Sequence, residues 1–314
     1  MRRALLTAFL AVSALVAAGP ASASLIVGRN PQHPILQVDS TGHALVSFTD
    51  GGKQEHILVW GAINASAPVR GKEQVAFQVD YSGGYKALKK AGYYKTIKSV
   101  CKPYTGPKLA WFVTGCTAPD GSFWALQSWQ RMLPNLGFKP WKPEQSVWEL
   151  HVSHWSGPLA QLQVWQDWAW GGRFHQILGQ LTYLGKPVYG FGATTVGAPT
   201  DSWGRNNYLD TYGSKYGPGW YRENSFLAQS PAGAFCYSFG PRPPYPGYPA
   251  SPPRQGNGTQ YRISVIGPGV TPVIMWQGPD VGDWDPSSAD DKALEAKVQA
   301  VKQTLELSSS VCHS

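Results

Sequence analysis

The alternation of apolar and polar positions is clearest between Val147 and Thr195, where it predicts an antiparallel meander. Gly171-Gly172 separates two strand-like runs. This pair suits a tight hairpin turn because glycine adopts positive φ without a Cβ clash. The turn sets a register in which Trp165 faces Leu178. A further strand, Val147 to Trp155, is expected to precede the hairpin in the same meander.

The two faces of the hairpin differ in character, since side chains alternate between them along each strand. One face is apolar and is predicted to be core; it carries Leu162, Val164, Trp168 and Ile177. The other combines aromatic rings, amides and a carboxylate: Trp165, Asp167, Phe174, Gln176 and Phe191. Rings stack on sugars while amides and acids bind hydroxyl groups, so this face is interpreted as a polysaccharide platform. The alternative is that both faces are covered and the tryptophans are core residues.

A loop-like stretch from Gly197 to Tyr221 follows the meander, and loops on a rigid sheet often carry binding groups. Its candidate ligand contacts are Asp201, Trp203, Asn206, Asp210 and Trp220.

The rest of the chain predicts more strands and two helices. Residues 35–63 have the pattern of a second meander, and Tyr85 to Lys98 that of a short basic helix. At the end of the chain, Ser288 and Asp291 form a capping-box-like start to a helix over 288–307, whose apolar stripe should pack on a sheet. We therefore predict a mainly β fold of antiparallel meanders, sandwich- or barrel-like, or α+β if the helices are counted.

Proline-rich stretches indicate where one part of the chain ends and the next begins. Two prolines between Lys139 and Glu144 suggest a junction, so an N-terminal part over 24–140 and a Trp-rich part over 141–314 are expected, or one domain over 24–314. The Pro-rich stretch 240–258 is predicted to be an extended loop within the second part.

The first 23 residues have the pattern of an export signal. Arg2-Arg3 is followed by an apolar run and by Ala21-Ser22-Ala23, so cleavage after Ala23 by a Sec-type route and a secreted protein are predicted. No later stretch is apolar enough for a transmembrane anchor. The four cysteines suit an oxidising compartment, and we predict the pairs Cys101–Cys116 and Cys236–Cys312 among three possible connectivities.

Positive charge is concentrated between Tyr81 and Pro119, a stretch with seven lysines and no acidic residue. The predicted basic patch consists of Lys86, Lys89, Lys90, Lys95 and Lys98. Such a run attracts anionic cell-wall polymers, polysaccharides or lipid head groups, although a solvated face without a partner is the simpler interpretation. Nucleic acid is not expected, because the chain shows no motif for it.

No catalytic motif is present, and the sequence indicates neither a metal site nor a cofactor. If the protein were a glycan hydrolase, Asp167, Glu149 and Glu223 would be its candidate carboxylates. The sequence favours non-catalytic binding of cell-surface or extracellular polysaccharide. A glycan hydrolase and a structural or protein-interaction role in the envelope remain as alternatives.

Overall fold

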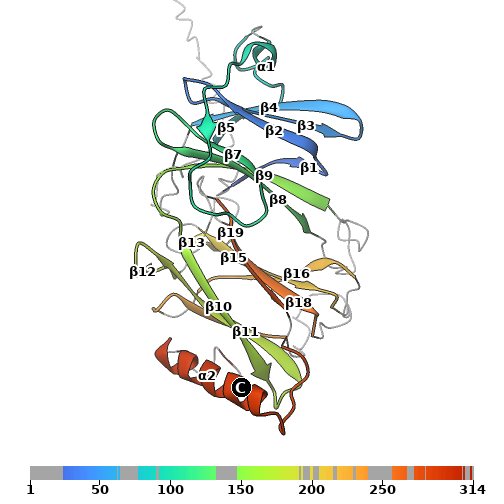
Figure 1. Ribbon diagram of the computed structural model, residues 1–314, viewed down its shortest axis with the longest axis vertical. Helices are drawn as coiled ribbons and strands as arrows, with labels where there is room; N and C mark the ends of the chain where they lie inside the picture. The colour runs from blue at the N-terminus through green and yellow to red at the C-terminus, as the bar shows by residue number, and fades with distance from the viewer. Residues whose placement is uncertain are drawn as a thin grey trace, which may run out of the picture.

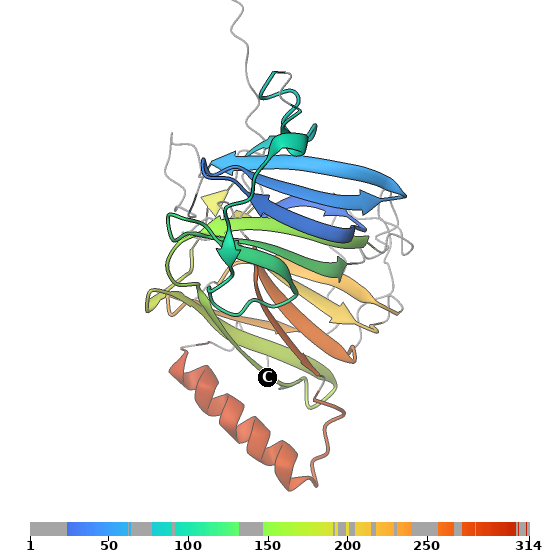
Figure 2. The ribbon, with the colours of Figure 1, turned by 45° about the horizontal axis from the view of Figure 1, so that its top comes forward.

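The computed structural model describes residues 24–61, 63, 77–89, 92–131, 147–190, 192–193, 199–200, 205–214, 218–228, 231–239, 257–266, 272–279, 281–305, 307 and 312. Over these residues the prediction of a mainly antiparallel β fold with a C-terminal helix is confirmed. Four sheets, named I to IV here, stack along the long axis, and the C-terminal helix covers the last one (Figures 1 and 2).

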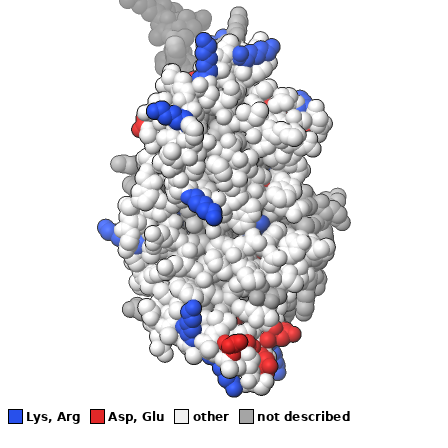
Figure 3. Space-filling view, in the orientation of Figure 1, with Lys and Arg blue, Asp and Glu red and all other residues white. Residues whose placement is uncertain are grey.

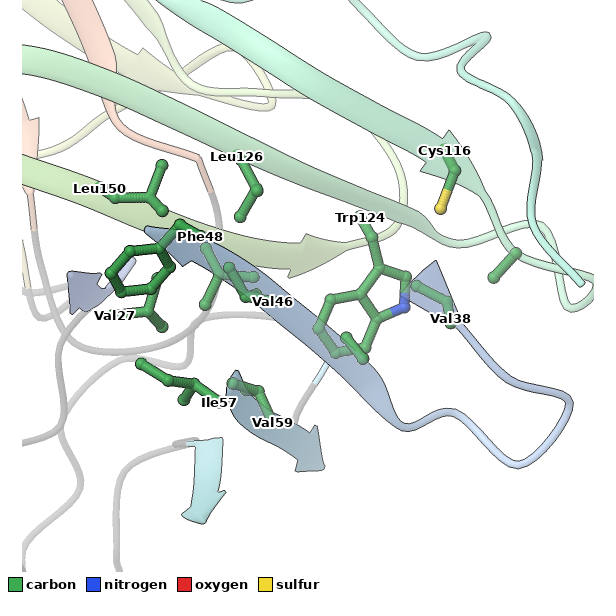
Figure 4. Close-up of a cluster of buried hydrophobic side chains, with 13 residues drawn as sticks. Val27, Val38, Val46, Phe48, Ile57, Val59, Cys116, Trp124, Leu126 and Leu150 are labelled. Atoms are coloured by element: carbon green, nitrogen blue, oxygen red, sulfur yellow. The ribbon is translucent and has the colours of Figure 1, made fainter. Parts of the chain in front are cut away.

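Sheets I and II form an N-terminal sandwich. Sheet I has the order β2 (Gln32–Val38), β3 (Ala44–Asp50), β4 (Lys53–Gly61) and β5 (Phe77–Asp80). Sheet II has the order β1 (Leu25–Arg29), β9 (Val147–Trp155), β8 (Phe123–Arg131), β7 (Phe112–Thr117) and β6 (Lys102–Pro103). Alternate residues of the facing strands, including Phe48, Trp124 and Leu150, fill the core between them (Figure 4).

Sheets III and IV form a second sandwich. Sheet III has the order β16 (Trp220–Phe226), β15 (Asn206–Tyr212), β18 (Gln260–Ile266) and β19 (Ile274–Pro279). Sheet IV contains β10 (Gln161–Ala169), β11 (Phe174–Tyr183), β12 (Lys186–Pro187) and β17 (Ala234–Ser238). Ile177, Phe235 and Ile263 are buried between these two sheets. A small separate pair is formed by β13 (Gly192–Ala193) and β14 (Pro199–Thr200).

The predicted register of the central hairpin is confirmed, with Trp165 opposite Leu178 and Asp167 opposite Gln176. The next turn is a two-residue loop at Leu184 and Gly185, because Tyr183 pairs directly with Lys186 and Thr182 with Pro187. Val188 N donates to Leu181 O, so Pro187 falls between two hydrogen-bonded positions, where a strand needs no N–H from it.

Strand β9 corrects the expected division of the chain. Val147–Trp155 was predicted to open the Trp-rich meander, but it pairs with β8 and β1 in sheet II. The alternation of apolar and polar residues within a strand does not indicate which other strands it pairs with. The chain therefore passes from sheet II to sheet IV between Trp155 and Gln161, and the predicted junction at 139–144 lies outside the described residues.

The two predicted helices have different outcomes. The described part of the basic segment contains one helical turn, α1 (Tyr93–Thr96), and Lys89 and Gly92 have positive φ, which is incompatible with a continuous helix over 85–98. By contrast, α2 (Ala289–Thr304) begins as expected, with Ser288 Oγ accepting from Asp291 N at 3.2 Å.

Both predicted disulfides, Cys101–Cys116 and Cys236–Cys312, are confirmed. The first joins the segment before β6 to β7 within the N-terminal sandwich, and the second ties the end of the chain to β17.

Candidate binding surfaces

The face predicted to be an open sugar platform is covered by α2. Trp165 belongs to the same hydrophobic cluster as Leu294, Val298 and Val301 of the helix, on the α2 side of sheet IV. Phe174 is half-buried, and Phe191 lies outside the described residues. The expectation of an exposed platform on this face is therefore wrong for Trp165. The apolar stripe of α2 is buried against this face of the sheet, so the face is not open to a ligand.

The polar members of that face have partners inside the protein. Asp167 is buried and its Oδ2 accepts from Lys302 Nζ of α2 at 2.9 Å. Gln176 is also buried, and its Nε2 donates to Ser238 Oγ at 2.8 Å. A carboxylate held by a buried lysine stabilises the docking of a helix and offers nothing to an external ligand.

The described residues of the predicted ligand loop lie mostly in strands. Asp201 and Trp203 lie outside the described residues, and Asn206 begins β15, where its backbone alone is described. Asp210 and Trp220 are buried in β15 and β16. The expectation that Asp210 and Trp220 are loop ligands is wrong. Glycines and asparagines made the segment look loop-like, yet β15 pairs with β18 across a wide sequence distance.

Asp210 instead forms the centre of a charged layer between sheets II and III. Its two carboxylate oxygens accept from Arg222 Nε at 2.8 Å and from Arg262 Nε at 2.9 Å, across directly paired strands. Burial alone would raise the pKa of Asp210, but the two guanidinium groups outweigh it and hold that pKa below its ordinary value. Arg262 also donates from Nη2 to Gln130 O of β8 at 2.6 Å, which links the two sandwiches.

Glu149 and His151 extend this layer from sheet II. Both are buried; Glu149 Oε2 lies 3.3 Å from His151 Nε2, and Ser24 Oγ lies 2.9 Å from His151 Nδ1. The His151 ring is stacked on Trp129 at 4.0 Å between centroids. A serine, a histidine and a carboxylate in a row resemble a nucleophile relay, but all three are enclosed between sheets and lack access for a substrate.

Two of the three candidate catalytic carboxylates, Asp167 and Glu149, lie far apart. Asp167 lies on the α2 side of sheet IV, whereas Glu149 lies in the layer between sheets II and III. Two sheets separate them, and packed sheets are about 10 Å apart. Glu223 lies in a β-bulge of β16 with its carboxylate oxygens buried. The pairing of Asp167 with Glu149 is therefore excluded as an acid–base pair across a sugar bond.

An exposed aromatic tip lies at the β10–β11 turn, where the sequence predicted only a hairpin. Trp170, Gly171 and Gly172 have successive φ angles of 59°, 64° and 82°, and the side chain of Trp170 is 48% exposed. A bulky residue with positive φ is strained, and such strain occurs more often at binding sites. The clue in the sequence was a tryptophan directly before the Gly-Gly pair.

The segment 281–287 holds this tip in place. Gly282 O accepts from Trp168 Nε1 at 2.8 Å, and Trp284 packs 5.0 Å from Trp168, centroid to centroid. The ring of Trp284 also lies over Gly172, where an added Cβ would meet it at 2.4 Å. Arg173 and Asp283 are exposed beside these rings. We call Trp170, Gly171, Gly172 and Trp284 the tryptophan tip.

The lysine patch is at the other end of the molecule. Lys86, Lys89, Lys95 and Lys98 are exposed, and Lys90 lies outside the described residues. Figure 3 shows Lys and Arg at the end where α1 lies, whereas acidic and basic side chains lie together at the end where α2 lies.

Comparisons add no functional information for this arrangement. No protein-family model, curated protein or solved structure matches the chain. Among the described residues, no helix is long and apolar enough to cross a membrane. In the same part of the chain, no three His, Cys, Asp or Glu side chains gather as a metal site would require.

Proposed function

We propose that the protein is exported and binds an extracellular polysaccharide without cleaving it, through the tryptophan tip. The observation that carries this proposal is Trp170, a ring 48% exposed on a backbone with φ of 59°. An exposed indole on a rigid turn can stack on the apolar face of a sugar ring at little entropic cost. The two disulfides and the signal-like N-terminus support export.

The surroundings of the tip favour an uncharged glycan. Asp283 and Asp285 are exposed in the segment that carries Trp284, and Asp290 is exposed in the first turn of α2. These carboxylates repel an anionic chain, whereas they accept hydrogen bonds from sugar hydroxyl groups. Arg173 adds a donor on the opposite side of the turn.

Affinity electrophoresis tests the proposal. The protein, with its disulfides intact, is run through gels that contain hydroxyethyl cellulose, xylan, mannan or dextran, and it is also mixed with insoluble cell-wall preparations. We expect retardation or co-sedimentation with at least one of them, and about tenfold weaker binding for Trp170→Ala, as loss of one stacked ring implies.

The matched control is Trp148→Ala, which removes an equally exposed tryptophan (48%) from β9 in sheet II. It should bind like the unchanged protein. The proposal is overturned if no glycan is bound, if both variants lose binding equally, or if reducing sugar is released in the mixtures. Release of reducing sugar would indicate that the protein is a glycan hydrolase.

A further inference from the structure

The loop from Tyr81 to Lys98 presents lysines and tyrosines together on one end of the molecule. Its described part comprises residues 81–89 and 92–98, and we call it the tyrosine–lysine loop. Tyr81 is 64% exposed and Tyr85 is 56% exposed, next to the exposed amines of Lys86 and Lys89. No acidic residue occurs between Tyr81 and Pro119 to offset these charges.

A buried carboxylate fixes the start of the loop. Asp80 is buried, and it accepts from Ser82 N at 2.8 Å, Lys86 N at 3.1 Å and Ala87 N at 2.6 Å. Burial would raise the pKa of Asp80, but these bonds and that from Ser82 Oγ outweigh it and lower the pKa below its ordinary value. The carboxylate is therefore ionised at neutral pH and holds the turn that aims Lys86 outward.

Two tyrosines of α1 fasten the far end of the loop to sheet I. Tyr94 stacks on His56 of β4 with 4.4 Å between ring centroids, and Tyr93 lies 5.7 Å from His43. Gly83 lets the chain approach His56 closely, because a Cβ there would meet that residue at 2.8 Å. The charges are thus presented on a pre-organised scaffold, which reduces the entropy lost on binding.

The composition of the exposed groups favours a polymer over a lipid bilayer or a nucleic acid. In the described part of the loop, the exposed large hydrophobic side chains are both tyrosines. Tyrosine combines a ring for a sugar face with a hydroxyl group, whereas insertion into a bilayer uses Trp, Phe or Leu. The cations are all lysines, which pair with anionic groups as point charges and lack the planar fork with which arginine recognises bases.

We propose that the tyrosine–lysine loop is a second binding site, for an extracellular polysaccharide that carries carboxylate or phosphate groups. It rests on the proposed export but not on the tryptophan tip, which lies at the α2 end of the molecule. The protein therefore binds an uncharged glycan at one end and an anionic chain at the other. The lysines pair with the anionic groups, and Tyr81 and Tyr85 stack on the sugar rings between them.

Binding to three probes tests this site at 0.15 M salt: fluorescein-labelled polygalacturonate, which carries carboxylates, purified wall teichoic acid, which carries phosphates, and vesicles of phosphatidylcholine and phosphatidylglycerol. We expect submillimolar affinity for at least one polymer and weaker binding to vesicles. The double variant Lys86→Gln/Lys89→Gln should bind the polymer about 25-fold more weakly, roughly fivefold for each lysine. It should also show a shallower dependence on salt.

The matched control is Lys292→Gln/Lys297→Gln, which removes the same charge from the exposed side of α2. Its affinity should stay within about twofold. Tyr81→Ala/Tyr85→Ala should weaken binding while the salt dependence is kept, a result that simple charge attraction does not give. Equal losses in both lysine pairs, tighter binding to vesicles, or no polymer binding would each overturn the inference. Trp170→Ala should leave this binding unchanged, which separates the two sites.

Discussion

Gly171 and Gly172 share a left-handed backbone but differ in what a side chain would meet. Gly171 has φ of +64° and open space around its missing Cβ, whereas Gly172 has φ of +82° and lies under the ring of Trp284. The contrast separates two physical effects, backbone strain and packing, at neighbouring positions of one turn.

Alanine substitutions at these glycines should differ in their cost. Gly171→Ala should lower the free energy of unfolding by about 1 kcal/mol, because an L-residue is strained at positive φ. Gly172→Ala should lower it by about 3 kcal/mol, because overpacking against Trp284 adds to the same strain. Urea unfolding followed by tryptophan fluorescence measures both, with the disulfides intact. Equal losses would show that the Trp284 ring is free to move away from the turn.

For single residues, the sequence predicted correctly those features that depend on neighbouring residues in the chain. The Gly-Gly pair predicted the turn and its register, and the cysteine pattern favoured the correct disulfides. The exposed position of Trp170 was not predicted, because nothing local indicates that the ladder ends at Ala169. Asp210 was interpreted as a loop ligand, because its two arginine partners are 12 and 52 residues away.

The helix α2 and the β10–β11 hairpin were both predicted correctly, but the face of the hairpin that α2 covers was predicted to be exposed to solvent. The capping residues and apolar spacing predicted α2, and alternation predicted the two faces of β10 and β11. Neither pattern says which face a helix covers, and the more polar face was assigned to solvent. In the structure, Asp167 is satisfied by Lys302 of the helix, so a carboxylate on a covered face is stabilised by a partner 135 residues away.

The ion pair between Asp167 and Lys302 should respond strongly to loss of one partner. Lys302→Met should lower the free energy of unfolding by about 3–5 kcal/mol, because Asp167 is left charged and buried. The double variant Asp167→Asn/Lys302→Met should recover most of this loss, since the buried charge is gone. Lys297→Met, on the exposed side of α2, is the control and should change stability by less than about 0.5 kcal/mol. A double variant no more stable than Lys302→Met would contradict the ion-pair account.

On the scale of the molecule, the two sandwiches are joined by polar contacts rather than by a shared apolar core. Gln127 of β8 exchanges hydrogen bonds with the backbone of Val273, and Arg262 reaches Gln130 O. Local patterns predicted strands within each sandwich. The Asp, Arg, Glu and His residues between the sheets have the same polar pattern as exposed residues, so the sequence does not indicate that they are buried. The position of this charged layer, and the place of β9 in sheet II, depend on pairing over long sequence distances.

Asp210 is the residue on which this charged layer depends most, since its carboxylate accepts from both Arg222 and Arg262. Asp210→Asn keeps the shape of the side chain but removes the negative charge in direct contact with two buried guanidinium groups, which keep only the longer-range attraction to carboxylates such as Glu149. We expect a loss of about 3–5 kcal/mol in the free energy of unfolding at pH 7, measured with urea. Asp50→Asn in the exposed β3–β4 turn is the control.

The pH dependence of the free energy of unfolding is a second test of the role of Asp210. Because the pKa of Asp210 in the folded protein lies below its ordinary value of 3.8, the unfolded chain takes up its proton first. The contribution of Asp210 is therefore complete above pH 3.8 and is lost as the pH falls through the folded-state value. Stability of Asp210→Asn should fall less steeply than that of the unchanged protein below about pH 4. Parallel pH profiles for the two proteins would mean that Asp210 does not hold the sandwiches together by its charge.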